Sequence, residues 1–197
     1  MLRSEVILMI TAVVPCFTCQ LHAVNIEFRR DAIIRPGDVY DIVSVYDTAP
    51  DTSTVNMFGG SVKRVQSYDS SIVNIHDGQV WGSIIARDFS TVNIHGGSLH
   101  LEYFAVSGLG TLNIYAGDVR IGNSPIFSDS SSVNIYGYGF DYDGVRVLRG
   151  FLSDDAPFLM SECYPSDYAH LNLIVIPEPT TIVLLGFATI LVRKRGQ

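Results

Sequence analysis

The sequence predicts an all-β protein: a short right-handed parallel β-helix, or β-solenoid, of about five rungs with atypical caps. A motif recurs in which Asn stands between two aliphatic residues and an aromatic residue or His follows. A turn glycine stands four residues after Asn in the first four copies, and the fifth copy has Tyr138 in its place. The copies are spaced by 18, 19, 20 and 21 residues, a regularity typical of solenoids. The repeated asparagines are Asn56, Asn74, Asn93, Asn113 and Asn134.

Alternation along each copy indicates which side chains face inward. Successive side chains of a strand point to opposite faces, so the two aliphatic residues share one face, and Asn and the following ring share the other. A single rung buries too little apolar surface to offset its loss of conformational entropy, so the rungs must stack. The alternative is an antiparallel β-sandwich of the same short strands. A sandwich does not require one residue type at one place in every turn, which favours the solenoid.

Composition excludes several classes of partner. Residues 24–176 carry nine Lys and Arg against eighteen Asp and Glu. Nucleic acid binding needs clustered cations, so neither nucleic acid nor an anionic lipid surface is an expected partner. Cys16 and Cys19 lie in an apolar N-terminal stretch, which argues against a redox or metal motif. Cys163 stands alone downstream, and we expect it to be a small buried residue or an idle thiol.

Residues 1–23 have the features of a secretory signal. Arg3 supplies a positive charge, Val6 to Val14 is an apolar run, and cleavage is expected after Ala23. The alternative is a buried N-terminal strand or helix. Residues 24–50 are expected to form N-terminal cap strands, because residues 24–28 and 42–46 alternate apolar and polar positions around a turn at residues 35–38. Residues 43–46 also echo the repeat, so we interpret them as an atypical end rung.

Residues 51–140 form the predicted array. Its first strand should place two aliphatic columns inside: Val55, Val73, Val92, Leu112 and Val133, and Met57, Ile75, Ile94, Ile114 and Ile135. A second strand is marked by an apolar residue six positions after each Asn, namely Val62, Val80, Leu99, Val119 and Phe140. A further column precedes each Asn by five positions and is expected to cap turns rather than bind calcium: Asp51, Asp69, Asp88 and Asp129, with Gly108 in the remaining copy.

Residues 141–176 depart from the repeat and are expected to close the array. Residues 141–144 and 153–157 have turn composition, while residues 145–148 and 171–176 are predicted strands.

Residues 177–197 form a distinct C-terminal segment. Pro177, Glu178 and Pro179 are followed by thirteen uncharged, mostly apolar residues and then by Arg193, Lys194 and Arg195. This order resembles the PEP-CTERM sorting signal. The resemblance implies export, transient anchoring of a transmembrane helix in the inner membrane, and processing near the Pro-Glu-Pro motif by an exosortase, a membrane protease of bacteria that make extracellular polysaccharide. The basic tail would stay in the cytoplasm. The alternative is a permanent tail anchor.

One outward column is a candidate binding surface. An exposed aromatic stripe beside the asparagines could contact glycans, whereas simple stacking between rungs needs no ligand. Two imidazoles without a third ligand make a poor metal site, so neither a metal nor another cofactor is expected. The column consists of Phe58, His76, His95, Tyr115 and Tyr136.

The sequence contains no Gly-x-Ser-x-Gly motif, no His-Glu-x-x-His motif and no phosphate-binding loop, and nothing marks a pair of carboxylates suited to glycoside chemistry. The sequence therefore predicts an exported bacterial protein of the cell envelope or extracellular matrix with a structural or adhesive solenoid. A polysaccharide-binding module is the second hypothesis, and a polysaccharide-acting enzyme is the third.

Overall fold

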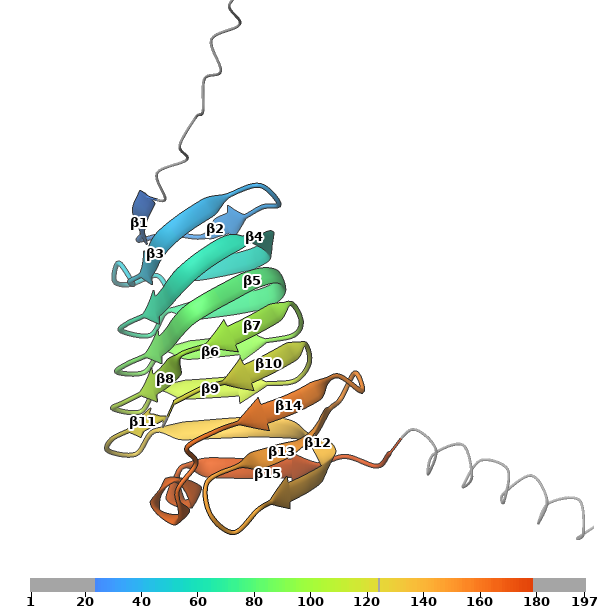
Figure 1. Ribbon diagram of the computed structural model, residues 1–197. Coiled ribbons are helices and arrows are strands. Elements are labelled where there is room, and N and C mark those ends of the chain that lie inside the picture. Colours follow the sequence, from blue (N-terminus) through green and yellow to red (C-terminus); the bar gives the residue numbers. More distant parts are fainter. Residues whose placement is uncertain (1–23, 124, 179–197) are drawn as a thin grey trace, which may run out of the picture.

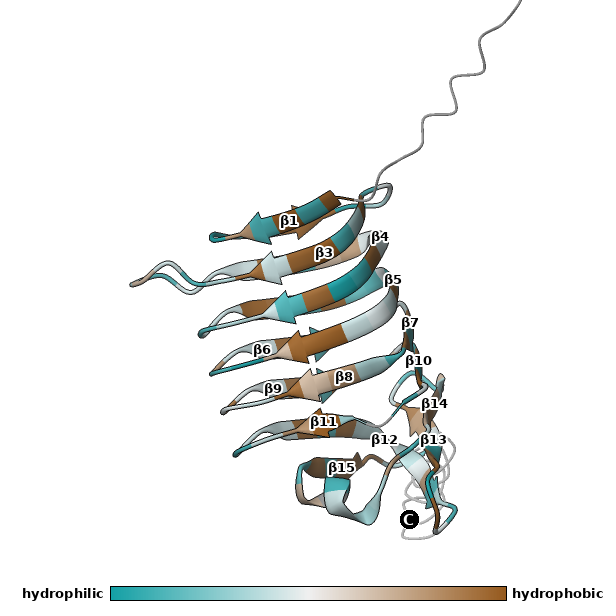
Figure 2. Ribbon diagram, turned by 60° about the vertical axis from the view of Figure 1, so that its left-hand side comes forward, coloured by the Kyte–Doolittle hydropathy of each residue, from teal (hydrophilic) through white to brown (hydrophobic). Residues whose placement is uncertain are grey.

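The computed structural model describes residues 24–123 and 125–178, which form a β-solenoid of about six turns. Parallel strands stack one below another from β1 at the N-terminal end to β15 at the other end (Figure 1). Apolar and polar residues alternate along strands such as β1 (Figure 2). The predicted solenoid is confirmed, and the alternative sandwich is not formed, because the strands of the repeats pair in parallel.

Strand pairing divides each complete turn into three faces. The asparagine face contains β2 (Ala32–Ile34), the first parts of β4 (Thr54–Ser67) and β5 (Ile72–Ala86), β6 (Thr91–Ile94), β9 (Thr111–Ile114), β12 (Ser132–Tyr142) and β15 (Leu171–Val175). The second face contains the start of β3 (Val39–Val45), the middle of β4 and β5, β7 (Ser98–Leu101), β10 (Asp118–Ile121) and β14 (Pro157–Met160). The third face contains β1 (Val24–Phe28), the ends of β3, β4 and β5, β8 (Tyr103–Val106) and β11 (Ile126–Phe127).

The interior is filled by columns of aliphatic side chains. Both predicted columns of the asparagine face are buried, and each of their members is at most 2% exposed. Val62, Val80, Leu99 and Val119 form the matching column of the second face. Val65, Ile84 and Phe104 fill the interior from the third face. β-branched and other aliphatic side chains suit such a pleated, close-packed surface.

The N-terminal rung differs from the prediction. Residues 43–45 are part of a rung, but they lie on the third face, where Val43 pairs with Val65. The first rung of the asparagine face is β2 instead, in which Ile33 takes the place of Asn above Asn56. The resemblance of residues 43–46 to the repeat was therefore misleading, because alternation alone does not distinguish one face of a solenoid from another. The turn at residues 35–38 is confirmed by a hydrogen bond from Asp38 N–H to the Arg35 carbonyl.

The fifth repeat does not close its turn. The chain continues along β12, which pairs antiparallel with β13 (Leu148–Leu152), and β13 pairs antiparallel with β14. As a result β14 takes the place beneath β10, and Val119 pairs with Phe158. Phe140 is only partly buried against the core, so it does not continue the column of Val62, Val80, Leu99 and Val119.

The end of the chain supplies one more rung than predicted. In β15 Leu171, Asn172 and Leu173 pair with Val133, Asn134 and Ile135, so the predicted cap strand is a sixth copy of the asparagine rung. A short 3-10 helix, η1 (Pro165–Ala169), leads into it. Cys163 is buried, as expected of a small core residue.

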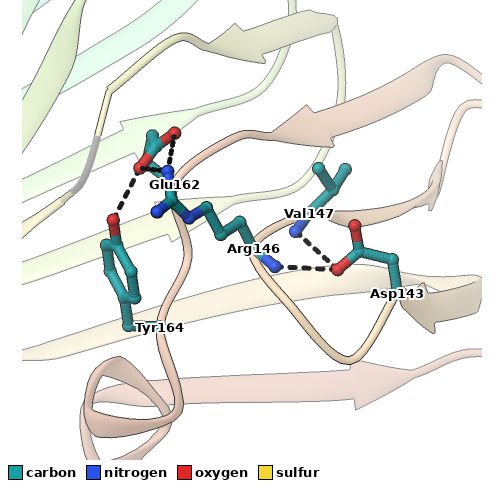
Figure 3. Close-up of polar contacts among 5 residues, drawn as sticks. All are labelled: Asp143, Arg146, Val147, Glu162 and Tyr164. Atoms are coloured by element: carbon teal, nitrogen blue, oxygen red, sulfur yellow. Dashed lines mark hydrogen bonds and ion pairs between the residues drawn. The ribbon is translucent and has the colours of Figure 1, made fainter.

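The strand predicted at residues 145–148 begins only at Leu148. The N–H groups of residues 145–147 all donate to Oδ1 of Asp143, which bends the chain there. Figure 3 shows the two of these bonds that come from Arg146 and Val147. Arg146 in that bend pairs with Glu162 at 3.2 Å, and the Tyr164 hydroxyl donates to the same carboxylate at 2.7 Å. These contacts fasten the closing loop, and the hydrogen bonds from Tyr164 and Arg146 lower the pKa of Glu162 against the effect of desolvation.

Several predictions concern residues outside the described part of the chain. The signal segment with its cleavage site at Ala23, the apolar run, Pro179, Arg193, Lys194 and Arg195 all lie there. Pro177 and Glu178 are described, and both are exposed. Within residues 24–123 and 125–178, no helix is both long and apolar enough to cross a membrane.

Candidate functional site

The asparagines of the repeat form a continuous hydrogen-bonded column, which we call the asparagine ladder. Each side-chain amide donates from Nδ2 to Oδ1 of the asparagine in the preceding rung, over 2.7 to 2.9 Å. All these bonds run in the same direction, and amide groups aligned in this way polarise one another favourably. The ladder runs from Asn56 to Asn172, one rung beyond the five asparagines recognised in the sequence.

The predicted aromatic column is present, and we call it the aromatic ladder. Ring centroids of successive rungs are 4.7, 5.1, 4.9 and 4.4 Å apart from Phe58 to Tyr136, with ring planes within 20° of parallel. Each inner ring therefore has both faces covered by its neighbours. Solvent reaches mainly ring edges and polar atoms, which is the geometry expected of stacking that stabilises the rungs.

The surroundings of the ladder alter its titration. The pKa of His95 is below its usual value because burial disfavours the imidazolium, and the adjacent His76 adds repulsion. Burial raises the pKa of Tyr115, as do its hydrogen bond and Coulomb interaction with Tyr136. The two imidazoles lie face to face, so their nitrogens do not converge on one point. In the part of the chain that the structure describes, no three His, Cys, Asp or Glu side chains are grouped as a metal site.

The glycine turns follow the aromatic ladder and connect the asparagine face to the second face. Gly60, Gly78, Gly97 and Gly117 all have positive φ, between 83° and 107°. A Cβ at Gly97 would lie 2.8 Å from the carbonyl oxygen of Gly78, and one at Gly117 would lie 2.8 Å from that of Gly97. The turns thus need glycine both for conformation and for close approach between rungs.

An open groove of about 810 Å³ runs along these turns. Among the described residues four carboxylates line it, and all are engaged: Asp118 accepts from Arg120 and His100, and the other three cap turns. Asp38 accepts from Arg35 N–H, Asp77 from Gly78 N–H and Asp154 from Gly117 N–H, over 2.7 to 2.9 Å. The last contact comes from the turn between β13 and β14, whose carboxylate caps the final glycine turn. The groove is therefore accounted for by rung packing and capping.

The predicted aspartate column does cap turns at the opposite corner. Asp69, Asp88 and Asp129 have φ of 55°, 58° and 59°, and Gly108 in the same column has 69°. Carboxylates reach back across the rungs: Asp88 accepts from Asp69 N–H at 3.3 Å and Asp129 from Gly108 N–H at 3.2 Å. Asp51 differs, since it lies in an isolated bridge to Thr48.

Two aromatic features escaped the sequence analysis. Tyr46 and Tyr68 stack at 4.6 Å at the corner after the third face, with Arg29 and Arg87 over their rings. Trp81 lies on the outer side of the second face with Lys63 Nζ 5.2 Å from its ring centroid. Counting seven residues from each Asn would have identified the column that contains Trp81.

Searches against protein families, characterised proteins and solved structures found no match to this chain.

Proposed function

We propose that this protein is an exported bacterial component of the cell envelope or extracellular matrix, in which the solenoid has a structural or adhesive role. The observation that carries the proposal is the junction at the end of the fold. β15 ends at Val175, and the exposed Pro177 and Glu178 follow at once. The Pro-Glu-Pro motif thus begins where the folded rod ends, in a place that a processing protease can reach.

The construction of the solenoid supports a structural role. Its interior is filled by side chains, and its two ladders and glycine turns tie each rung to the next. The hydrogen bonds that join rungs run along the long axis, so the rod resists extension along it. Such a body suits the spacing or joining of other components outside the cell.

Mass spectrometry of the protein isolated from its native cells tests the sorting proposal. We expect a mature chain that begins near Val24 and lacks Arg193 to Arg195, with processing near Pro177 by an exosortase-type protease. Replacing Pro177, Glu178 and Pro179 with alanine should block that processing. A Pro165→Ala change at the exposed start of η1 is the matched control and should leave it intact. An intact Met1 would reject the signal peptide, and a retained basic tail would indicate a permanent anchor.

A polysaccharide-binding module is the second candidate function. The aromatic ladder lies on the outside of the solenoid, beside the amides of the asparagine ladder. Because neighbouring rings cover one another, a glycan at this ladder would contact ring edges and amides instead of ring faces. Replacing Tyr115 and Tyr136 with alanine tests this contact, and unchanged polysaccharide binding by the variant would reject it.

A further inference from the structure

The outer side of the second face carries the chain's single tryptophan next to a lysine. Residues two apart in a strand point to the same side, so each rung presents two outward residues here. We call this surface the tryptophan face. Its first column holds Ser61, Gln79, Ser98 and Asp118, which pair in register. Two positions further along the chain stand Lys63, Trp81, His100 and Arg120. His100 pairs with Arg120, and Lys63 Nζ lies over the Trp81 ring, where the strand register shifts by one residue.

Trp81 differs from the rings of the aromatic ladder. Trp81 is 49% exposed, and none of the ring stacks found among the described residues includes it, although Lys63 Nζ lies over its ring. The C–H side of a sugar packs against the apolar, electron-rich face of an aromatic ring. Trp81 therefore offers what the aromatic ladder lacks, an outward indole that is not enclosed between two other rings.

The charges around Trp81 are unusual for this acidic protein. Residues 24–178 carry nine Lys and Arg against nineteen Asp and Glu. On the tryptophan face Lys63 and Arg120 are accompanied by one carboxylate, Asp118. That carboxylate accepts hydrogen bonds from Arg120 at 3.0 Å and from His100 at 3.2 Å. The carboxylate is thus already paired. With Glu102, which lines the adjoining depression, the surface has two carboxylates against two Lys or Arg side chains, so it lacks the excess of negative charge found in the rest of the chain.

A shallow depression adjoins the lower end of this face. It has a volume of about 400 Å³, and His100, Arg120 and Leu159 line it. Asn123, Ser161 and Glu102 also lie on its wall and can form hydrogen bonds with hydroxyl groups. An extended ligand along the solenoid axis would pass Lys63, Trp81, His100 and Arg120 in successive rungs, about 4.8 Å apart.

We propose that the tryptophan face binds an acidic polysaccharide. One sugar ring packs against Trp81, and carboxylates of neighbouring sugars pair with Lys63 and Arg120. Gln79 and Asn123 hydrogen-bond to hydroxyl groups. This assignment deepens the second candidate function and depends on export only for access to the polymer. Its test uses purified protein, so its outcome is independent of the processing experiment.

Fluorescence titration of the purified full-length chain tests the proposal directly. With one tryptophan in the chain, intrinsic indole emission reports on this face alone. Polygalacturonate should change the emission of Trp81 saturably, and higher salt should weaken binding because exposed charge pairs are screened. Uncharged dextran should not change the emission of Trp81. Absence of any change with polygalacturonate would overturn the proposal, as would an equal response to polyglutamate, which would indicate an acidic peptide instead.

Calorimetry of variants locates the contact. Trp81→Ala and the double change Lys63→Gln with Arg120→Gln should each weaken polygalacturonate binding about tenfold or more, the scale of losing an exposed anchor residue. Phe89→Ala is the matched control, because Phe89 is 65% exposed at a turn away from this face. Circular dichroism checks folding. Unchanged binding by folded Trp81→Ala, or a loss confined to Tyr115→Ala with Tyr136→Ala, would overturn the assignment.

Discussion

Val119 pairs in parallel register with Phe158, although Phe140 follows Asn134 by the same six residues that separate Val119 from Asn113. The cause lies at one position. Four repeats have glycine four residues after Asn, with positive φ and a carbonyl of the preceding rung close to the missing Cβ. The fifth repeat has Tyr138 there, so its chain cannot make the turn and continues outward as β12. The hairpin of β13 and β14 then fills the vacant strand position.

A charge in the interior column should unfold the solenoid. Val92 is fully buried, and Val92→Asp would place a carboxylate without a partner among aliphatic side chains. The cost is several kcal/mol, comparable to the 5–15 kcal/mol by which domains are typically stable. Thermal unfolding followed by circular dichroism measures it. Thr91→Asp, on the outward side of the same strand, is the control and should remain folded. Equal melting of the two variants would contradict the inward column.

The glycine turns should tolerate no side chain. Gly97→Ala would combine a φ of 93° with a Cβ 2.8 Å from the Gly78 carbonyl oxygen. Gly37→Ala has a similar φ of 96° but meets nothing within 4 Å, so it isolates the conformational cost. That cost is about 1–2 kcal/mol for a residue in the left-handed region. We expect Gly97→Ala to lose clearly more stability than Gly37→Ala in urea titration. Similar losses would show that rung contact contributes little.

The asparagine ladder should depend on the donor at each rung. Asn93 donates to Asn74 and accepts from Asn113, both at 2.8 Å. Asn93→Asp keeps the shape and the acceptor but loses the donor at neutral pH, which costs about 1–3 kcal/mol for a partly buried polar group. Asn172→Asp, at the exposed end, should cost less. Urea midpoints at pH 7 compare the two, and equal losses would argue against a cooperative ladder.

Acid should weaken the solenoid through His95. Because burial and the nearby His76 lower its pKa, the folded chain binds the proton less tightly than the unfolded chain. Stability is therefore fully present above the ordinary value of 6.5, declines as pH falls through it, and stops declining below the folded pKa. Urea midpoints between pH 8 and 5 measure this. His95→Phe keeps a ring between His76 and Tyr115 and should reduce the decline. An identical pH profile would exclude His95 as the source.

Much of the architecture could be predicted because the repeat itself indicates which side chains face inward and that the rungs stack. Alternation about Asn93 gives the inward pair Val92 and Ile94, and the spacing of the copies gives the stacking. The aromatic ladder could be predicted in the same way, because its rings stand two residues after each Asn. Where the motif is incomplete, the sequence did not show which segment forms a rung. Asn172 stands 38 residues after Asn134, beyond an inserted hairpin, so its rung was interpreted as a cap.

Rungs and columns in which no residue type recurs were harder to predict. β2 carries Ile33 in the Asn position, and only its pairing with β4 reveals it as a rung. Trp81 shares its column with Lys63, His100 and Arg120, which have no chemistry in common that a repeat search would detect. The strand expected at residues 145–148 failed because Asp143 bends the backbone by accepting three N–H groups.

The Asn-to-Asn interval grows from 18 to 21 residues along the array, yet the strands of the asparagine face stay in register. The additional residues are accommodated outside the segments that pair on this face. The turn between two faces can therefore be lengthened without disturbing the stacked strands. Peptides inserted at these turns would be displayed at a regular spacing along the solenoid.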